Sequence, residues 1–339
     1  MRNRTLLLST LALGAAALAL ILLEPSDKPP APAETPLVPA GLLADLRSVE
    51  VTSGGRTARI ERTEAGWVVP SKFGLPADTD NRLRPLLQSL RQAKSLGTLT
   101  ADPRRLERLG LADNSVTLTG ADGKPWKLEL GRMTDDGAGV AARLPGETAA
   151  LRTSFAGHLE GEAANWFDPV LLTFAADQVT ALTLAFGADR SGLAFTRDKA
   201  GEPLKGDKAS PAALEAAEEL LLSLATLRAA DAVAPDDAEA KAALAAAPIV
   251  VSLTLADGTT VGIAFGKAKA KDGEPPRGWM SVQHSDPKHP ANAKAAKALF
   301  TCPPWLIDQV PSAATDLGKR PEPPAAPQGL PTLELEPAR

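Results

Sequence analysis

Two stretches of the sequence, SVTLTGADGKPWKLELGR from Ser115 to Arg132 and VVSLTLADGTTVGIAFGK from Val250 to Lys267, repeat one pattern 135 positions apart. In each stretch, apolar and polar residues alternate on both sides of an Asp-Gly pair, which is typical of a half-buried hairpin. We interpret Asp122 and Asp257 as turn residues that hold the local backbone, and not as catalytic acids. The glycine that follows each aspartate is expected to take a positive φ angle.

The repeat extends beyond the hairpins. The same offset aligns Arg62, Ala65, Gly66, Leu86 and Leu87 with Arg197, Ala200, Gly201, Leu221 and Leu222. The chain is therefore predicted to contain a duplicated unit. The predicted fold class is α+β, with two tandem homologous repeats after an N-terminal transmembrane helix. Each repeat is predicted to be a mainly antiparallel sheet packed by one longer helix and by short helices.

The periodicity of apolar residues places the main helices. The first repeat is expected to have its longer helix over residues 80–94, with a late start or a kink at Pro85. The second repeat is expected to begin its helix with Ser210 as N-cap and Pro211 as first residue, and to continue its inward stripe to Arg228. A short helix between Asp102 and Gly110 follows in the first repeat. The remaining expectations are strands over 49–51, 58–62, 67–69, 140–143, 179–186, 193–197 and 279–283, with Trp166 and Trp305 in the core.

The amino terminus predicts the location of the protein. Arg2 and Arg4 precede an apolar run from Leu6 to Leu23, whose length as a helix is about 27 Å, close to the thickness of the hydrocarbon core of a bilayer. An uncleaved anchor, a cleaved secretory signal and a buried core helix are the alternatives. We favour the anchor because Glu24-Pro25 is not a small-x-small cleavage site. The arginines favour a cytoplasmic N-terminus, which places the rest of the chain in the periplasm as a single-pass inner-membrane protein.

The distribution of proline along the chain indicates where the folded repeats begin and end. Residues 24–41 and 311–339 are rich in proline, and residues 24–40 in particular are expected to form neither a helix nor a β-ladder but an extended linker. The predicted segments are 1–23 (signal anchor), 24–41 (proline-rich linker), 42–174 (first repeat), 175–310 (second repeat) and 311–339 (disordered tail).

Composition also excludes classes of function. The chain has 339 residues, of which 44% are hydrophobic and 23% charged, and its net charge is −4. This balance is typical of globular domains and gives no electrostatic footprint for nucleic acid. The single cysteine, Cys302, excludes an intramolecular disulfide and a cysteine-based zinc site.

The run RRLERLGLADNSVTLTGADGKPWKLELGR, preceded by EAGWVV and by the leucine-striped helix, resembles the family called domain of unknown function 4340. The first repeat has the Gly66-Trp67 strand, Gly110-Leu111 and the hairpin, whereas the second repeat has Glu202 opposite Trp67 and an alanine run over 242–247. The resemblance implies a membrane-anchored bacterial protein associated with an uncharacterised ABC-type transport system of the gliding-motility kind. It implies no catalytic residue.

The sequence contains few candidates for chemistry. His284 and His289 flank an aspartate in HSDPKH, which could suggest a metal site, but two prolines favour a solvated loop. The sequence context of His158 indicates no nucleophile that this histidine could activate. The pairs Asp135-Asp136 and Asp236-Asp237 are interpreted as hydrated loop residues, and Gly266 to Gly278 as a flexible loop and not a phosphate cradle. We therefore predict no catalytic, cofactor-binding or metal-ligating residue and no cofactor.

Three hypotheses of function remain open. The favoured one is a non-enzymatic, membrane-anchored interaction or scaffold subunit that serves membrane-complex proteins, for example as an accessory to an ABC-type transport complex. The second is a module that binds an envelope polymer or small solute in a cleft between the repeats. The third is an extracytoplasmic enzyme. In all three, residues 6–23 are expected to contact the cytoplasmic membrane, and no nucleic acid is expected as a partner.

Overall fold

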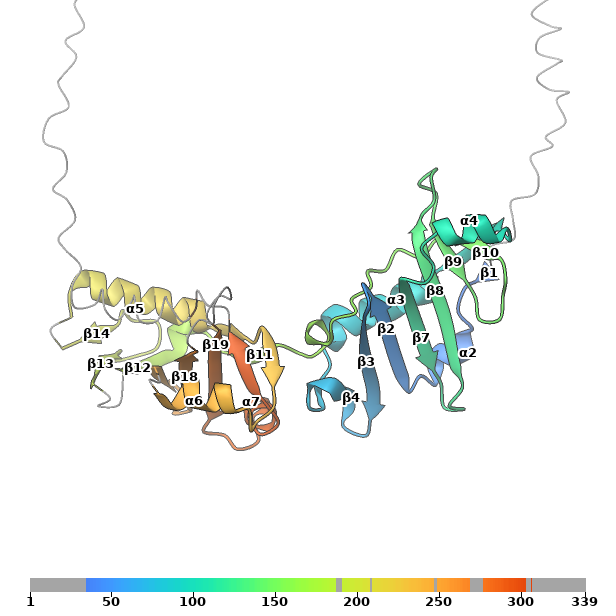
Figure 1. Ribbon diagram of the computed structural model, residues 1–339. Helices are drawn as coiled ribbons and strands as arrows, with labels where there is room; N and C mark the ends of the chain where they lie inside the picture. The colour runs from blue at the N-terminus through green and yellow to red at the C-terminus, as the bar shows by residue number, and fades with distance from the viewer. Residues whose placement is uncertain are drawn as a thin grey trace, which may run out of the picture.

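The repeated stretches form two antiparallel hairpins, one in each half of the chain (Figure 1). The first consists of β7 (Asn114–Thr119) and β8 (Pro125–Met133), and the second of β17 (Ile249–Leu255) and β18 (Thr260–Lys267). Asp122 accepts a hydrogen bond from the backbone of Lys124 at 3.1 Å, and Asp257 accepts one from Thr259 at 2.9 Å. The glycines after these aspartates have φ angles of 72° and 85°. The turn interpretation of both aspartates is confirmed.

The computed structural model describes residues 35–186, 191–207, 209–246, 249–268, 277–302 and 306. The predicted anchor over residues 6–23, most of the predicted linker, Trp305 and the tail over 311–339 lie outside the described residues. Among the described residues, no helix is both long enough and apolar enough to cross a membrane.

Each hairpin lies at the centre of a larger antiparallel sheet. Within the described ranges, the first sheet has ten strands, which are in spatial order β1 (Thr35–Pro36), β6 (Lys94–Thr100), β10 (Ala150–Thr153), β9 (Val140–Arg143), β8, β7, β2 (Ser48–Ser53), β3 (Arg56–Thr63), β4 (Gly66–Val69) and β5 (Leu75–Pro76). The described part of the second sheet has eight, which are β14 (Lys205–Gly206), β13 (Ser191–Thr196), β12 (Val179–Phe186), β17, β18, β19 (Gly278–His284), β20 (Leu299–Cys302) and β16 (Asp231–Val233). We call each sheet with its helices the first and the second lobe.

The two sheets share one strand order. The run β6-β10-β9-β8-β7-β2-β3 in the first lobe corresponds to β16-β20-β19-β18-β17-β12-β13 in the second. The predicted α+β class, with mainly antiparallel sheets, is confirmed. A separate two-stranded sheet pairs β11 (Val170–Thr173) with β15 (Thr226–Arg228).

One longer helix packs on the same face of each sheet. The structure has α3 (Arg84–Gln92) in the first lobe and α5 (Pro211–Leu224) in the second, and their inward residues join one hydrophobic core with the alternate residues of the central strands. Ser210 caps α5 as predicted, because its side chain accepts a hydrogen bond from Ala213 at 3.2 Å. The prediction that the inward stripe of this helix continues to Arg228 is wrong, because α5 ends at Leu224 and Arg228 is an exposed residue of β15. Further helices and helical turns are α2 (Ala40–Ala44), η1 (Pro70–Lys72), η3 (Ala163–Asn165), η4 (Ala176–Gln178) and α7 (Pro290–Ala295).

A short helix packs on the opposite face of each sheet. These helices are α4 (Pro103–Arg108), capped by Asp102 as predicted, and α6 (Ala238–Ala246). The backbone passes very close to the central hairpin: a Cβ atom at Gly131 would lie 2.2 Å from the carbonyl oxygen of Leu109, and one at Gly266 would lie 2.4 Å from that of Ala243. These two glycines occupy equivalent positions of the repeat, so a close backbone contact accounts for their identity.

The segment before residue 42 takes part in the fold, which differs from the expectation of an extended linker. Thr35 and Pro36 pair with β6, and the backbone of Leu37 donates a hydrogen bond to Ala93 at 2.9 Å. Leu37 and Val38 are buried in the core. Proline permits this arrangement because β1 is an edge strand, where a missing N–H leaves no ladder bond unmade.

Three lysines connect the lobes or fix the segment between them. Lys294 of α7 is buried and bonds the carboxylate of Asp168 at 2.6 Å and the carbonyl oxygens of Asp168 and Val170. Lys72 forms an ion pair with Asp231, and Lys297 donates to the carbonyl oxygen of Gly74 at 2.8 Å. Lys294 thus fixes the chain between the sheets, and Lys72 and Lys297 join the two lobes directly.

We expect Gly266→Ala to destabilise the protein by about 1–3 kcal/mol, because the new methyl group overpacks the backbone of α6. Gly262→Ala, in the same strand, is the matched control, since a Cβ at Gly262 meets no atom within 4 Å. Urea unfolding followed by circular dichroism measures both. Equal unfolding midpoints for the two variants would show that the close contact does not constrain this position.

Candidate functional site

The start of α3 is shaped by Pro85. The carboxylate of Asp78 accepts a hydrogen bond from the backbone of Asn81 at 3.0 Å and begins a π-helical turn, η2 (Thr79–Leu83), which leads into α3. Pro85 is then the second residue of the α-helix, where the missing N–H is tolerated. The predicted late start is confirmed. The wide turn before the proline lies at the end of α3 nearer to Trp67.

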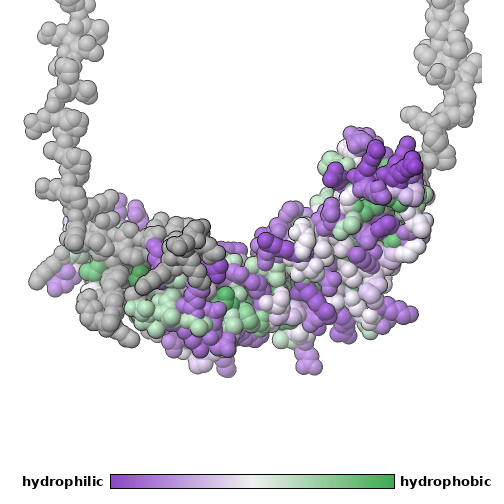
Figure 2. All heavy atoms as spheres, in the orientation of Figure 1, coloured by the Kyte–Doolittle hydropathy of each residue, from purple (hydrophilic) through white to green (hydrophobic). Residues whose placement is uncertain are grey.

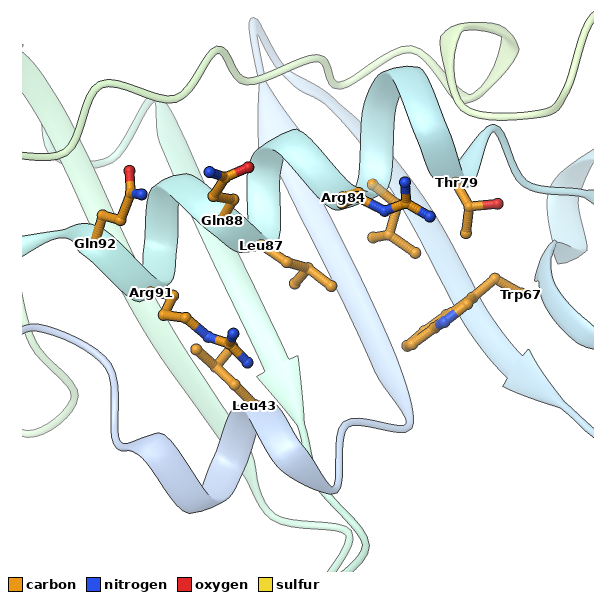
Figure 3. A pocket seen from close by; sticks show the side chains of 9 residues that line it. Leu43, Trp67, Thr79, Arg84, Leu87, Gln88, Arg91 and Gln92 are labelled. Carbon is orange, nitrogen blue, oxygen red and sulfur yellow. The ribbon is translucent and has the colours of Figure 1, made fainter.

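A groove lies between α3, α2 and β4, and we call it the groove under α3 (Figure 3). Its volume is about 550 Å³. Leu87 and Arg91 of α3 point into it, while Gln88 and Gln92 point away from Trp67 and Leu43 in this view. Trp67 from β4 and Leu43 from α2 face these side chains from the other side. The groove is lined by Leu43, Trp67, Thr79, Leu83, Arg84, Leu87, Gln88, Arg91 and Gln92.

The groove carries positive charge over an apolar floor. Arg84 pairs with Asp80 at 2.8 Å, but both side chains are 72% exposed, so solvent screens this pair and it is easily exchanged. Arg91 has no hydrogen-bond or ion-pair partner within the part of the chain that the structure describes. A guanidinium beside leucine and tryptophan side chains suits a ligand that carries a carboxylate next to apolar groups.

In the second lobe, an ion pair stands where the first lobe has the tryptophan end of the groove. Arg197, which aligns with Arg62, has a side chain that is only 4% exposed, and it bonds Glu218 of α5 at 2.7 Å. It also donates to the carbonyl oxygen of Glu202, the residue that stands where the first lobe has Trp67. Glu218 in turn accepts a hydrogen bond from the backbone of Leu204 at 3.0 Å. The tryptophan and arginine groove is therefore a property of the first lobe.

The structure assigns the two histidines of HSDPKH to local backbone bonding. Their rings stack with centroids 3.8 Å apart. His284 accepts a hydrogen bond from the backbone of Asp286 at 3.1 Å, and His289 accepts one from Ala291 at 3.2 Å and so caps α7. Among the described residues, no group of three or more histidine, cysteine, aspartate or glutamate side chains could hold a metal ion.

His158 lies at a second, smaller pocket in the first lobe, of about 310 Å³. Its ring bonds the carboxylate of Glu160 at 2.9 Å, and its side chain is 78% exposed. Ser53 lines the same pocket, but its hydroxyl donates to Asn114 at 2.7 Å. A serine whose proton is directed to an amide oxygen is not activated as a nucleophile by the histidine.

The acidic pairs are turn and cap residues. Asp136 accepts a hydrogen bond from the hydroxyl of Thr134 at 2.7 Å, which, with the backbone of Ala138, lowers the pKa of this carboxyl. Asp237 accepts one from the backbone of Ala240 at 2.8 Å, at the start of α6. Of the predicted loop between Gly266 and Gly278, residues 269–276 lie outside the described part.

Cys302, on β20, is buried. Burial raises the pKa of its thiol to about 12, so the side chain behaves as an apolar core residue. None of the sequence candidates, which are His158, His284, His289, the paired aspartates and Cys302, lines the groove under α3. The signal in the sequence that could have indicated the groove is Trp67 together with Arg84 and Arg91 of the following helix.

The family model described as domain of unknown function (DUF4340) matches residues 67–247, which is more than half of the chain. The chain belongs to this family. The DUF4340 match begins at Trp67 and ends after α6, so it includes the arginines of the groove and crosses from the first lobe into the second. No curated protein and no solved structure matches the chain.

The cap on α7 predicts a pH dependence. Burial, with a smaller effect of the neighbouring His284, lowers the pKa of His289 below the usual value of 6.5. The unfolded chain therefore binds a proton more readily than the folded chain, and stability is lost as the pH falls through 6.5 toward the folded pKa. We expect His289→Asn, which keeps a capping side chain, to reduce the loss of stability between pH 7 and pH 5. Thermal unfolding of both proteins across this range measures the difference, and identical slopes would contradict the assignment.

Proposed function

We propose that this protein is a non-enzymatic interaction subunit of a membrane complex and that the groove under α3 is its binding site. The observation that carries the proposal is Arg91, a guanidinium without a partner in the described part of the chain, set beside Leu43, Leu87 and Trp67. A protein segment with alternating apolar and acidic side chains matches both the floor and the charge of the groove. Tryptophan and arginine are also the side chains that most often dominate protein interfaces.

In this proposal the two lobes are copies of one duplicated module, of which the first keeps the groove. Residues 6–23 anchor the chain in the bacterial inner membrane, and both lobes lie on the extracytoplasmic side. The partner belongs to a membrane complex, for which the family resemblance suggests an ABC-type transport system. The common strand order and the equivalent glycines at 131 and 266 support the duplication.

The alternative is a module that binds an envelope polymer or a small solute. The groove supports this alternative only through the indole of Trp67, on which a sugar ring could stack. Arg91 favours an acidic ligand instead. The two candidates differ in their response to charge reversal at Arg91: a bound acidic protein segment is released, whereas a glycan stacked on Trp67 is retained.

We expect Arg91→Glu to release the partner. The full-length tagged protein is purified from detergent-solubilised membranes of its own bacterium, and co-purifying membrane proteins are quantified by mass spectrometry. The wild type should retain a membrane protein that Arg91→Glu and Trp67→Ala both lose, because each variant removes one half of the recognition.

Arg104→Glu is the matched control, since it reverses an exposed arginine in the first turn of α4, outside the groove and where a carboxylate is favourable. It should retain the partner. Equal recovery of partners with all variants would contradict the proposal, as would recovery of the tagged protein alone together with a failure of the protein to self-associate. Binding of purified envelope glycans that is lost in Trp67→Ala but kept in Arg91→Glu would favour the alternative.

The predicted location is tested separately. A reporter phosphatase that is active only outside the cytoplasm is fused after residue 339, and we expect it to be active. Deletion of residues 6–23 should abolish its activity. An active fusion without these residues, or an inactive fusion with them, would contradict the extracytoplasmic placement.

A further inference from the structure

The outer face of α5 carries an acidic and apolar stripe. Glu215, Glu219 and Leu222 follow one another at spacings of four and three residues, so they lie on one side of the helix. Leu222 is 67% exposed, which is unusual for a large apolar side chain, and both glutamates are exposed. Figure 1 shows α5 along the outer side of the second lobe.

This stripe is unfavourable in the isolated chain. Two glutamates four residues apart repel each other on a helix surface. Neither has a hydrogen-bond or ion-pair partner within the described ranges, and the last turn of α5 has no basic residue. A cation brought by a second surface would relieve the repulsion, and an apolar pocket would cover Leu222.

The groove under α3 supplies both features at matching spacings. In the arrangement that we consider, α5 of one copy lies antiparallel to α3 of another, with Leu222 opposite Leu87. Along the helix axis, Glu219 then lies about 4.5 Å from Leu222, and Arg91 lies about 6 Å from Leu87 in the same direction. The unpartnered arginine then meets an unpartnered glutamate. Leu222 enters the space between Leu43, Leu87 and Trp67.

We propose that the groove of one molecule binds the outer face of α5 of a second copy of this chain. The inference rests on the proposed function of the groove as a protein-binding site, and it names the partner. The two surfaces lie on different lobes, so the contact is head-to-tail, and a pair of molecules still has one free groove on one copy and one free α5 face on the other. Such contacts build a ring or an open chain of molecules along the membrane.

The position of the contact is tested by cross-linking. The full chain is purified in a mild detergent as Leu87→Cys and as Leu222→Cys, and each is treated with a short bis-maleimide alone and after mixing. The native Cys302 does not interfere, because it is buried and its thiol has a pKa of about 12. We expect a cross-linked dimer in the mixture and none in the separate samples.

The double variant should give a ladder of cross-linked multimers. Leu222→Cys mixed with Arg104→Cys, on α4, is the negative control. No dimer in the mixture, dimers of equal yield in the separate samples, or a double variant that cross-links only within one molecule would each overturn the inference.

A charge exchange tests the pairing itself. Arg91→Glu and Glu219→Arg are each expected to weaken self-association about tenfold in sedimentation velocity, and the two changes in one chain should restore it. A double variant no better than the single ones would overturn the inference. If self-association is absent while Arg91→Glu still releases a membrane partner, the groove function stands and the second copy is wrong; if neither occurs, both fail.

Discussion

The central hairpin of each lobe is the constraint on which the rest of the structure depends. Its alternating pattern buries a row of apolar side chains, four in the first lobe and five in the second, on one face of the sheet, and the longer helix packs there. On the other face, a glycine lets the backbone of a short helix approach to a distance that no side chain permits. The two faces are therefore used differently, one for a large core and one for a close backbone contact. The buried hairpin residues on this face are Val116, Leu118, Leu128 and Leu130 in the first lobe and Val251, Leu253, Val261, Ile263 and Phe265 in the second.

The parts of the fold that sequence reasoning predicted well depend on local physics. The hairpin register follows from strict alternation and from an Asp-Gly turn, and the late start of α3 follows from the geometry of Pro85. Periodicity alone failed at the end of α5, because Arg228 continues the stripe in sequence although the chain has turned into β15. The proline-rich composition before residue 42 concealed β1, since proline is compatible with an edge strand.

The groove could not be predicted in the same way, because it joins α2, β4 and one face of α3, which are separated in sequence. The sequence shows the tryptophan and the arginines of the groove, but it does not show that these side chains come together. The histidines of HSDPKH show the opposite case. Their role is local, and a histidine directly before Pro290 at a helix start is compatible with a capping side chain. The lobes also differ at this position: the second lobe has Glu202 where the first has Trp67, and Arg197 is buried in an ion pair with Glu218, whereas the aligned Arg62 is exposed.

The edge position of β1 has a mechanical consequence. A force applied to the chain before Thr35 reaches the fold through the two residues of β1 that pair with β6. In an edge strand, such residue pairs can separate one at a time. The force then meets Leu37 and Val38, which must leave the core together before α2 is disturbed. Under tension from the amino-terminal side, the β1–β6 pairing therefore separates at low force, and removal of Leu37 and Val38 from the core requires a higher force. This division would allow small displacements of the preceding chain without unfolding the sheet that carries the groove.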